Sequence, residues 1–160
     1  MFNRRSLLIT GLAICGVCAA PSRSNAQSPN SGPLFTATRE QLDCVKIVIA
    51  QQDAWNKGDL DGYLSHYKNS PDTQAVLATL VRGFDNVRNA YHINFPNKDA
   101  MGSIEDSEVE VKELGPNYAI ATGKYHLNRS KKSGGSVDGT FMEVFEKTPN
   151  GWQIVYSAST

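Results

Sequence analysis

Hydrophobic positions repeat at helical spacing in the first half of the chain. Leu42, Val45 and Ile49 recur every three or four residues, which predicts a long helix with a broad buried face. Thr38 is a suitable N-cap for this helix, and Gln41 stands at the spacing of a capping box. The first helix is therefore expected to begin directly after Thr38.

Glycine, aspartate and proline separate two further helices. Gly58 can end the first helix in the left-handed conformation, and Asp59 can cap the second. The apolar side of the second helix comprises Leu60, Tyr63, Leu64 and Tyr67. A third helix is predicted between Gly83 and Pro96, because proline cannot continue a helix. Its buried side comprises Phe84, Val87, Tyr91 and Phe95.

Strand patterns occupy the rest of the chain. The segment TQAVLATLVRG, between the second and third helices, predicts one strand. After Ile104 the apolar residues alternate, which predicts a run of strands joined by turns. These strands are SEVEVKELG, YAIATGKYHLN, GTFMEVFEK and the closing GWQIVYSAST. In the closing strand, alternation places Trp152, Ile154, Tyr156 and Ala158 on one covered face.

Helices followed by hairpin-linked strands indicate an α+β fold. Three N-terminal helices are expected to cover one face of a strongly curved antiparallel sheet. The other face of the sheet keeps four apolar residues among polar ones, namely Ile120, Met142, Val144 and Val155. A monomer would expose that patch, so we expect a homodimer in which a second copy covers it.

The N-terminus predicts export. Arg4 and Arg5 precede an apolar run from Leu7 to Ala20, and a small-residue cleavage site ends at Ala26. Residues 1–26 are therefore expected to form a signal peptide of the general secretory or twin-arginine type, with the mature protein periplasmic or secreted. Residues 27–37 form a flexible lead-in, and residues 38–160 a single domain.

Charge and cysteine content narrow the possible partners. Cleavage removes three arginines and no acid, so 13 basic residues would face 16 acidic ones. This balance argues against nucleic-acid binding and against a membrane surface after cleavage. Two of the three cysteines lie in the signal, and Cys44 is expected to be a buried core residue. No metal-ligand spacing occurs, and neither a metal nor a cofactor is expected.

Three stretches resemble one fold superfamily in both order and spacing. They are AQQDAWNKGDLDGYLSHY, MGSIEDSEVEVKELGPNYAIATGKYHL and GTFMEVFEKTPNGWQIV. Together they are similar to the nuclear transport factor 2-like superfamily, most of all to small exported bacterial members near the SnoaL-like and ketosteroid isomerase-like groups. The resemblance implies a cone-shaped fold with a pocket between sheet and helices, and commonly a homodimer through the outer sheet face.

Related members often end in a strand that carries His-Asp-His. Tyr156, Ser157 and Ala158 stand at those positions here. This departure weakens any transfer of acid-base chemistry from the superfamily, so no catalytic residue is carried over. Fold alone does not decide function.

Aromatic residues are the best candidates for a binding site. Eight of them are predicted to face the pocket and to contact a small apolar or aromatic ligand: Trp55, Tyr63, Tyr67, Tyr91, Phe95, Tyr125, Phe141 and Tyr156. Buried tyrosines need partners for their hydroxyl groups, so many tyrosines suit a pocket better than a core built only for stability. The alternative is that these rings simply fill the cone.

Glu143 and His92 are the candidates for catalysis. Glu143 shares a strand face with Phe141 and Phe145, so it could be a buried acid with a raised pKa. His92 follows Tyr91 and would reach the pocket mouth after a modest rotation of the third helix. Three functions stay open: a small-molecule binder, a cofactor-free proton-transfer enzyme (isomerase, cyclase or hydratase), and a dimeric protein-interaction module.

Overall fold

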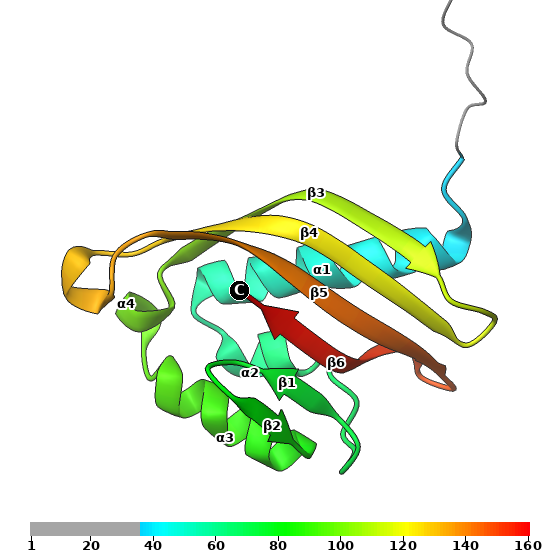
Figure 1. Ribbon diagram of the computed structural model, residues 1–160, viewed down its shortest axis with the longest axis horizontal. Helices are drawn as coiled ribbons and strands as arrows, with labels where there is room; N and C mark the ends of the chain where they lie inside the picture. The colour runs from blue at the N-terminus through cyan, green and yellow to red at the C-terminus, as the bar shows by residue number, and fades with distance from the viewer. Residues whose placement is uncertain (1–35) are drawn as a thin grey trace, which may run out of the picture. The chain divides into compact units, whose positions relative to one another are not determined.

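The computed structural model describes residues 36–160 of the chain (Figure 1). The predicted signal peptide and nearly all of the lead-in lie outside the described residues. The helices are α1 (Arg39–Lys57), α2 (Leu60–Leu64), α3 (Phe84–Asn94) and α4 (Lys98–Met101), with a 3-10 turn η1 (Lys131–Ser133). The strands are β1 (Gln74–Val76), β2 (Leu80–Arg82), β3 (Ser103–Glu113), β4 (Tyr118–Asn128), β5 (Val137–Thr148) and β6 (Gly151–Ser159).

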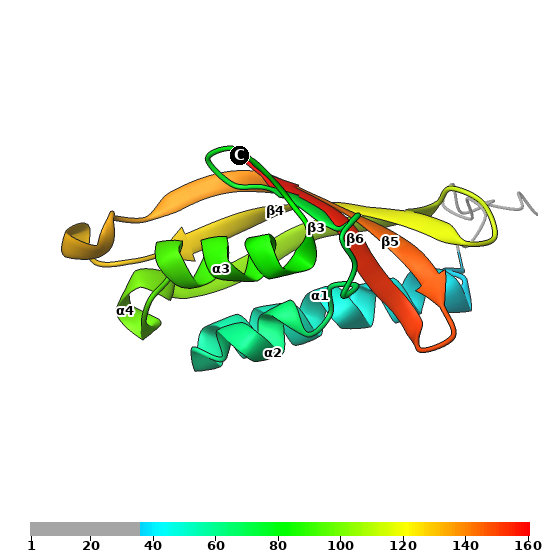
Figure 2. The ribbon, with the colours of Figure 1, turned by 90° about the horizontal axis from the view of Figure 1, so that it is seen from below.

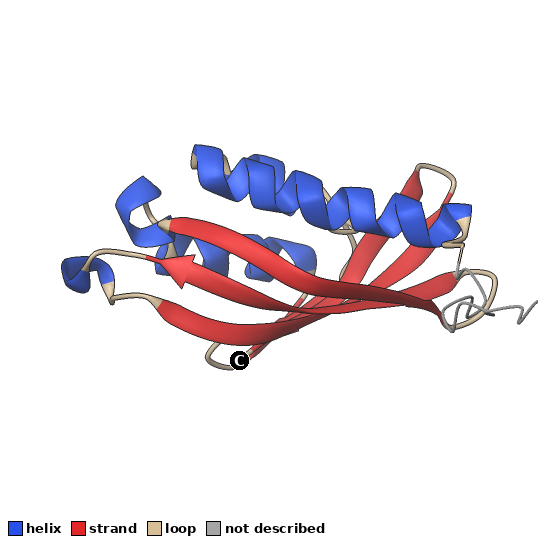
Figure 3. Cartoon of the chain, turned by 90° about the horizontal axis from the view of Figure 1, so that it is seen from above, coloured by secondary structure: helices blue, strands red, loops and turns tan. Residues whose placement is uncertain are grey.

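The strands form one sheet in the order β2-β1-β6-β5-β4-β3. The helices gather on one face of this sheet (Figure 2), and α1 lies along β3 and β4 (Figure 3). The predicted α+β class is therefore confirmed, with a fourth, short helix that the sequence pattern did not indicate.

The sheet is mixed, whereas the sequence predicted a wholly antiparallel one. β1 runs parallel to β6, and every other neighbouring pair is antiparallel. The cause is the segment that leads into β1. His66 and Lys68 already bond to Ile154 of β6 on both sides of Tyr67, through Ile154 N to His66 O and Lys68 N to Ile154 O. The chain thus enters β1 already aligned with β6.

Two predicted elements are shorter than expected. The segment TQAVLATLVRG forms a hairpin of β1 and β2 with Val76 opposite Leu80, because the chain turns at residues 77–79. This turn contains no glycine or proline, so the sequence pattern predicted one continuous strand. Helix α2 ends at Leu64, and Tyr67 occupies the isolated bridge to β6 instead of a further helical turn.

The predicted boundaries of α1 are confirmed. The Thr38 side chain accepts a hydrogen bond from Gln41 N, and the Gln41 side chain accepts one from Thr38 N, which completes the capping box. Gly58 ends the helix in the left-handed conformation. Asp59 then caps α2 by accepting from Gly62 N at 2.8 Å.

The inner face of α1 differs from the predicted one. Cys44, Val48, Gln51 and Trp55 are buried, whereas Leu42 and Ile49 are 49% and 53% exposed. The prediction that Leu42 and Ile49 lie on the buried face is therefore wrong.

Two bulges change which residues face inward. In β3 the register shifts between Ser107 and Glu110, and Glu108 has a positive φ of 51°. In β6 Val155 is the extra residue, because Ile154 pairs with Phe145 while Tyr156 pairs with Val144. A bulge reverses the alternation beyond it. Ser157 therefore faces inward, and the prediction that Tyr156 and Ala158 share the inner face with Ile154 is wrong.

The core lies between the sheet and α1, α2 and α3. Its fully buried members come from both layers and include Cys44, Leu64, Val87 and Phe145. Burial raises the pKa of the Cys44 thiol to about 12, so this cysteine stays protonated and packs as a small apolar residue.

Candidate functional site

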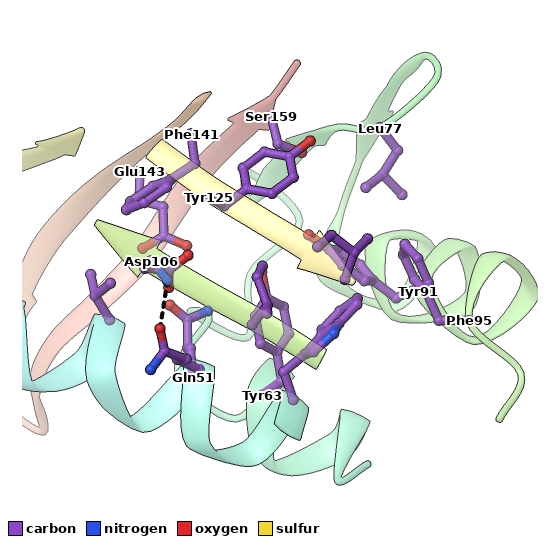
Figure 4. Close-up of a pocket in the computed structure, with 15 residues that line it drawn as sticks. Gln51, Tyr63, Leu77, Tyr91, Phe95, Asp106, Tyr125, Phe141, Glu143 and Ser159 are labelled. Atoms are coloured by element: carbon purple, nitrogen blue, oxygen red, sulfur yellow. Dashed lines mark hydrogen bonds between the residues drawn. The ribbon is translucent and has the colours of Figure 1, made fainter. Parts of the chain in front are cut away.

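A cavity of about 130 Å³ lies between the inner face of the sheet and the helices (Figure 4). Its lining comes from α1, α2, α3 and its C-cap, the turn between β1 and β2, and strands β3 to β6. The lining residues are Val48, Gln51, Gln52, Trp55, Tyr63, Leu77, Tyr91, Phe95, Ile104, Asp106, Tyr125, Leu127, Phe141, Glu143 and Ser159. The rings of the helical layer and two carboxyl groups lie toward opposite ends of this cavity (Figure 4).

Four aromatic rings form a closed circuit on the helical side. The ring of Trp55 lies 5.3 Å from that of Tyr63 and 4.8 Å from that of Phe95, both edge to face. Tyr91 closes the circuit, at 5.5 Å from Tyr63 and 6.0 Å from Phe95. The Trp55 indole nitrogen donates to Met101 O at 2.9 Å, which fixes the ring. Because each ring packs against two others, this wall is rigid.

A chain of hydroxyl groups extends from the cavity into the core. The hydroxyl of Tyr67 lies 3.3 Å from that of Tyr91 and donates to Ser157 Oγ at 3.0 Å. Burial raises the pKa of both phenols, so they remain protonated donors. The inward position of Ser157, which the β6 bulge creates, thus gives Tyr67 the partner that a buried hydroxyl requires.

Glycines on the sheet make room for two further lining rings. Gly123 lies opposite Phe141, and Gly139 lies opposite Tyr125. A Cβ atom at Gly123 would stand 2.6 Å from Phe141 Cε1, and one at Gly139 would stand 2.6 Å from Tyr125 Cε1. Each ring therefore lies across a neighbouring strand at a position where a larger residue would collide with it.

Two carboxyl groups and an amide occupy the other end of the cavity (Figure 4). Glu143 is 6% exposed, and its carboxyl faces Gln51. With the Gln51 amide nitrogen toward it, Glu143 accepts at 3.2 Å on both carboxylate oxygens. Asp106, on β3, is held by its backbone, whose N–H donates to Gln52 Oε1 at 2.6 Å.

Burial makes both acids weak. Desolvation, with the nearby charge of Asp106, raises the pKa of Glu143 to about 8, although the Gln51 hydrogen bond lowers it. Desolvation alone raises the pKa of Asp106 to about 6. At neutral pH the cavity therefore holds one protonated and one ionised carboxyl group, an arrangement that can both donate and accept a proton.

The structure brings together six of the eight predicted ligand contacts. Trp55, Tyr63, Tyr91, Phe95, Tyr125 and Phe141 all line the cavity. Tyr67 lies behind the lining, where it supports Tyr91. Tyr156 lies on the outer sheet face beside Val144, because of the bulge at Val155. Whether any of these residues contacts a ligand stays a prediction.

The two catalytic candidates separate. Glu143 lines the cavity, and the expectation of a raised pKa agrees with its surroundings. His92 lies on the exposed side of α3, where its Nε2 atom is 3.2 Å from Asp61 Oδ1 beside Arg88. It does not line the cavity, so the expectation that it reaches the pocket mouth is wrong. The i, i+1 spacing from Tyr91 turns it away.

Sequence reasoning missed the polar partners of Glu143. Asp106 precedes the β3 bulge, whereas the clear alternation of Val109 and Val111 follows it. Extending that alternation back across the bulge would wrongly place Asp106 on the outer face. Its pairing with Tyr125 is the signal that could have found it, because opposite residues share a face. Gln51 was missed because a polar residue inside a helical stripe gives no pattern of its own.

Two further properties of residues 36–160 bear on the site. Within this range no group of three or more histidine, cysteine, aspartate or glutamate residues is arranged to hold a metal ion. None of the described helices has the length and apolar character needed to cross a bilayer.

Comparison with solved structures identifies the fold. A nuclear transport factor 2-like protein of unknown function from Shewanella oneidensis MR-1 has 29% identity and a TM-score of 0.66, over 73% of this chain and 95% of that one. A similar protein from Pseudomonas putida KT2440 has 14% identity and a TM-score of 0.63, over 78% and 87%. A superfamily protein from Salmonella enterica serovar Typhimurium has 18% identity and a TM-score of 0.61, over 74% and 88%. No protein-family model and no curated protein matches the sequence.

Proposed function

This chain is a nuclear transport factor 2-like protein by fold, and we propose that it binds one small molecule in the cavity between sheet and helices. The observation that carries the proposal is the open space itself. Residues that would form a solid core if they only supplied stability instead enclose about 130 Å³. An apolar cavity of about 150 Å³ is large enough for benzene.

The lining favours a ligand with one flat apolar part and one polar group. The four-ring wall offers faces and edges to a flat part, and the end formed by Glu143, Asp106 and Gln51 offers hydrogen bonds. A few placed polar groups within an apolar lining are typical of small-molecule sites. One-ring compounds with a single polar substituent are therefore the size class to test.

A fragment titration followed by nuclear magnetic resonance tests this function. Single-ring compounds are added to ¹⁵N-labelled residues 36–160, and the amide shifts of the backbone are followed. We expect saturable shifts on α1, β3 and β5 near Gln51, Asp106 and Glu143. Shifts confined to the outer sheet face, or none at millimolar fragment, would contradict the proposal. Ile104→Trp, which fills the cavity, should abolish the shifts, whereas Thr122→Trp on the outer face should not.

Proton-transfer catalysis is the second candidate, in the manner of the SnoaL-like and ketosteroid isomerase-like groups. The observation that favours it is the pair of carboxyl groups, one with a pKa of about 8 and one of about 6. Asp106 would serve as the base and Glu143 as the acid. Deuterium incorporation from heavy water into small ketones measures this chemistry directly. Loss of exchange in both Glu143→Gln and Asp106→Asn would support it, and exchange that neither variant changes would contradict it.

Export and dimerisation complete the proposal. The signal-like segment supports a periplasmic or secreted location, and mass spectrometry of the periplasmic protein should find a chain that begins at Gln27.

On the outer sheet face Ile120, Met142, Val144 and Tyr156 are only half-buried, which supports pairing with a second copy. Light scattering should give twice the chain mass, and Val144→Lys should give a monomer.

A further inference from the structure

We propose that the cavity takes its ligand as a cation, a small ammonium ion that carries one ring, with the nitrogen between Glu143 and Asp106 and the ring against the four-ring wall. This rests on the proposed binding function and names the class of ligand. It starts from the charges that line the cavity.

Among the residues that the structure describes, the cavity lining holds two carboxyl groups and no basic side chain. Within residues 36–160 neither Glu143 nor Asp106 takes part in a salt bridge, although exposed acids such as Asp61 and Glu108 do. No lysine, arginine or histidine lowers the pKa of either group. A negative charge in a desolvated cavity without a counter-charge is unfavourable. A proton on Glu143 removes that charge, and a ligand cation would compensate it more favourably.

The hydrogen-bonding capacity of Glu143 is also incomplete. A carboxylate has about four acceptor positions. Among the described residues, the only donor to Glu143 is the Gln51 amide, shared between its two oxygens at 3.2 Å. The residue is nonetheless only 6% exposed. An ammonium group has up to three donors and no acceptor, which matches a site that contains acceptors and lacks donors.

The aromatic wall suits the rest of such a ligand. An aromatic ligand ring packs offset or edge to face against the faces of aromatic side chains, so the wall can hold this ring while the ammonium group lies at the acidic end. Trp55, Tyr63 and Tyr91 supply such faces within the same cavity as the two acids. A neutral carbonyl ligand would use only the protonated Glu143 and would leave the ionised Asp106 without a counter-charge. An anion would be repelled by both.

Benzylamine and benzyl alcohol form a matched test pair, because they share the ring and differ in charge. Calorimetry on residues 36–160 compares their affinities at about pH 8.5 and about pH 5. The other titratable groups near Glu143, namely Cys44, Tyr63, Tyr67 and Tyr91, have raised pKa values and stay protonated over this range. Changes in affinity over this range therefore report on the two carboxyl groups.

We expect benzylamine to bind about tenfold more tightly than benzyl alcohol at the higher pH, with most of that advantage lost at the lower pH. Glu143→Gln and Asp106→Asn should each reduce benzylamine affinity about tenfold and change benzyl alcohol affinity little. Glu110→Gln, an exposed acid on β3, should change neither. Benzyl alcohol binding as well as benzylamine at the higher pH would overturn the cation and leave small-molecule binding intact. If neither compound binds, both proposals fail.

Discussion

The Gln51 amide faces both carboxylate oxygens of Glu143 at 3.2 Å, at the acidic end of the cavity. An ionised Glu143 requires the amide nitrogen in this position. A protonated Glu143 can instead donate its own O–H to the amide oxygen. Gln51 can therefore remain paired with Glu143 in both protonation states by turning its amide group, which suits a site that exchanges a proton for a ligand.

Unfolding should become easier as pH rises through the range in which Glu143 holds its proton. The pKa of Glu143 is about 8 in the folded protein, against 4.5 for an unperturbed glutamate, so between these values the folded state binds more protons than the unfolded state. The free energy of unfolding should then fall by up to about 1.4 kcal/mol per pH unit from this group. Asp106, raised from 3.8 to about 6, acts in the same direction at lower pH.

Urea unfolding at several pH values measures this effect in the wild type and in Glu143→Gln. The variant should lose the part of the slope that lies above about pH 6. Glu110→Gln, an exposed glutamate on the outer face, should leave the slope unchanged. An unfolding free energy that rises with pH over this range in the wild type would show that Glu143 is ionised in the folded protein.

Substitution of Gly123 should close the cavity. The new Cβ in Gly123→Ala would meet the ring of Phe141 at 2.6 Å, so the ring must move into the space beside it. We expect a loss of about 1 to 3 kcal/mol in stability and ligand affinity at least tenfold lower. Thr122→Ala, at the neighbouring exposed position, is the control. Unchanged affinity in Gly123→Ala would mean that Phe141 does not border the bound ligand.

The hydroxyl chain should behave as a single unit. Tyr67→Phe removes the bond to Ser157 and leaves Ser157 and Tyr91 with fewer partners, which should cost about 1 to 2 kcal/mol. Because Ser157→Ala removes the same bond, the double variant should cost less than the sum of the two. Chemical denaturation of the four proteins measures the coupling. Strict additivity would show that the Tyr67–Ser157 bond contributes nothing.

The β3 bulge depends on the residue at its left-handed position. Glu108 adopts a φ of 51°, and its carboxylate pairs with Lys124 Nζ at 2.8 Å. A β-branched residue is strongly disfavoured there. Glu108→Val should therefore cost at least about 1 kcal/mol, in the range expected for backbone strain. Glu110→Val, on a regular part of β3, should cost little. Equal effects in thermal unfolding would mean that the bulge does not constrain residue 108.

The class of fold and most of the aromatic wall were predictable from the sequence. Apolar spacing located α1 and α3, and caps at Thr38, Gly58 and Asp59 set the helix boundaries. Once the layers are known, the inner stripes of these helices must meet the sheet. Trp55, Tyr63 and Tyr91 therefore line the cavity as predicted. Tyr67, predicted on the same stripe as Tyr63, does not, because α2 ends at Leu64.

The polar end of the site was only partly predictable, because bulges have no reliable local signal. Because Val155 is an extra residue in β6, Ser157 faces inward and Tyr156 faces outward. Because of the bulge at Glu108, the alternation of Val109 and Val111 does not show that Asp106 faces the cavity. Glu143 was identified because its strand is regular around Phe141 and Phe145. Gln51 can be recognised as the partner of Glu143 only once α1 and β5 are known to face each other.

Contacts between a bound ring and the cavity wall test the central claim most directly. Isotope-filtered nuclear magnetic resonance on labelled residues 36–160, with unlabelled benzylamine, reports protons of the ligand that lie close to protons of the protein. We predict contacts from the ligand ring to the Trp55 indole and the Phe95 ring, and from its methylene group to Gln51. Contacts only to outer-face residues such as Met142 and Tyr156, or no contacts at saturating ligand, would contradict a binding cavity in this fold.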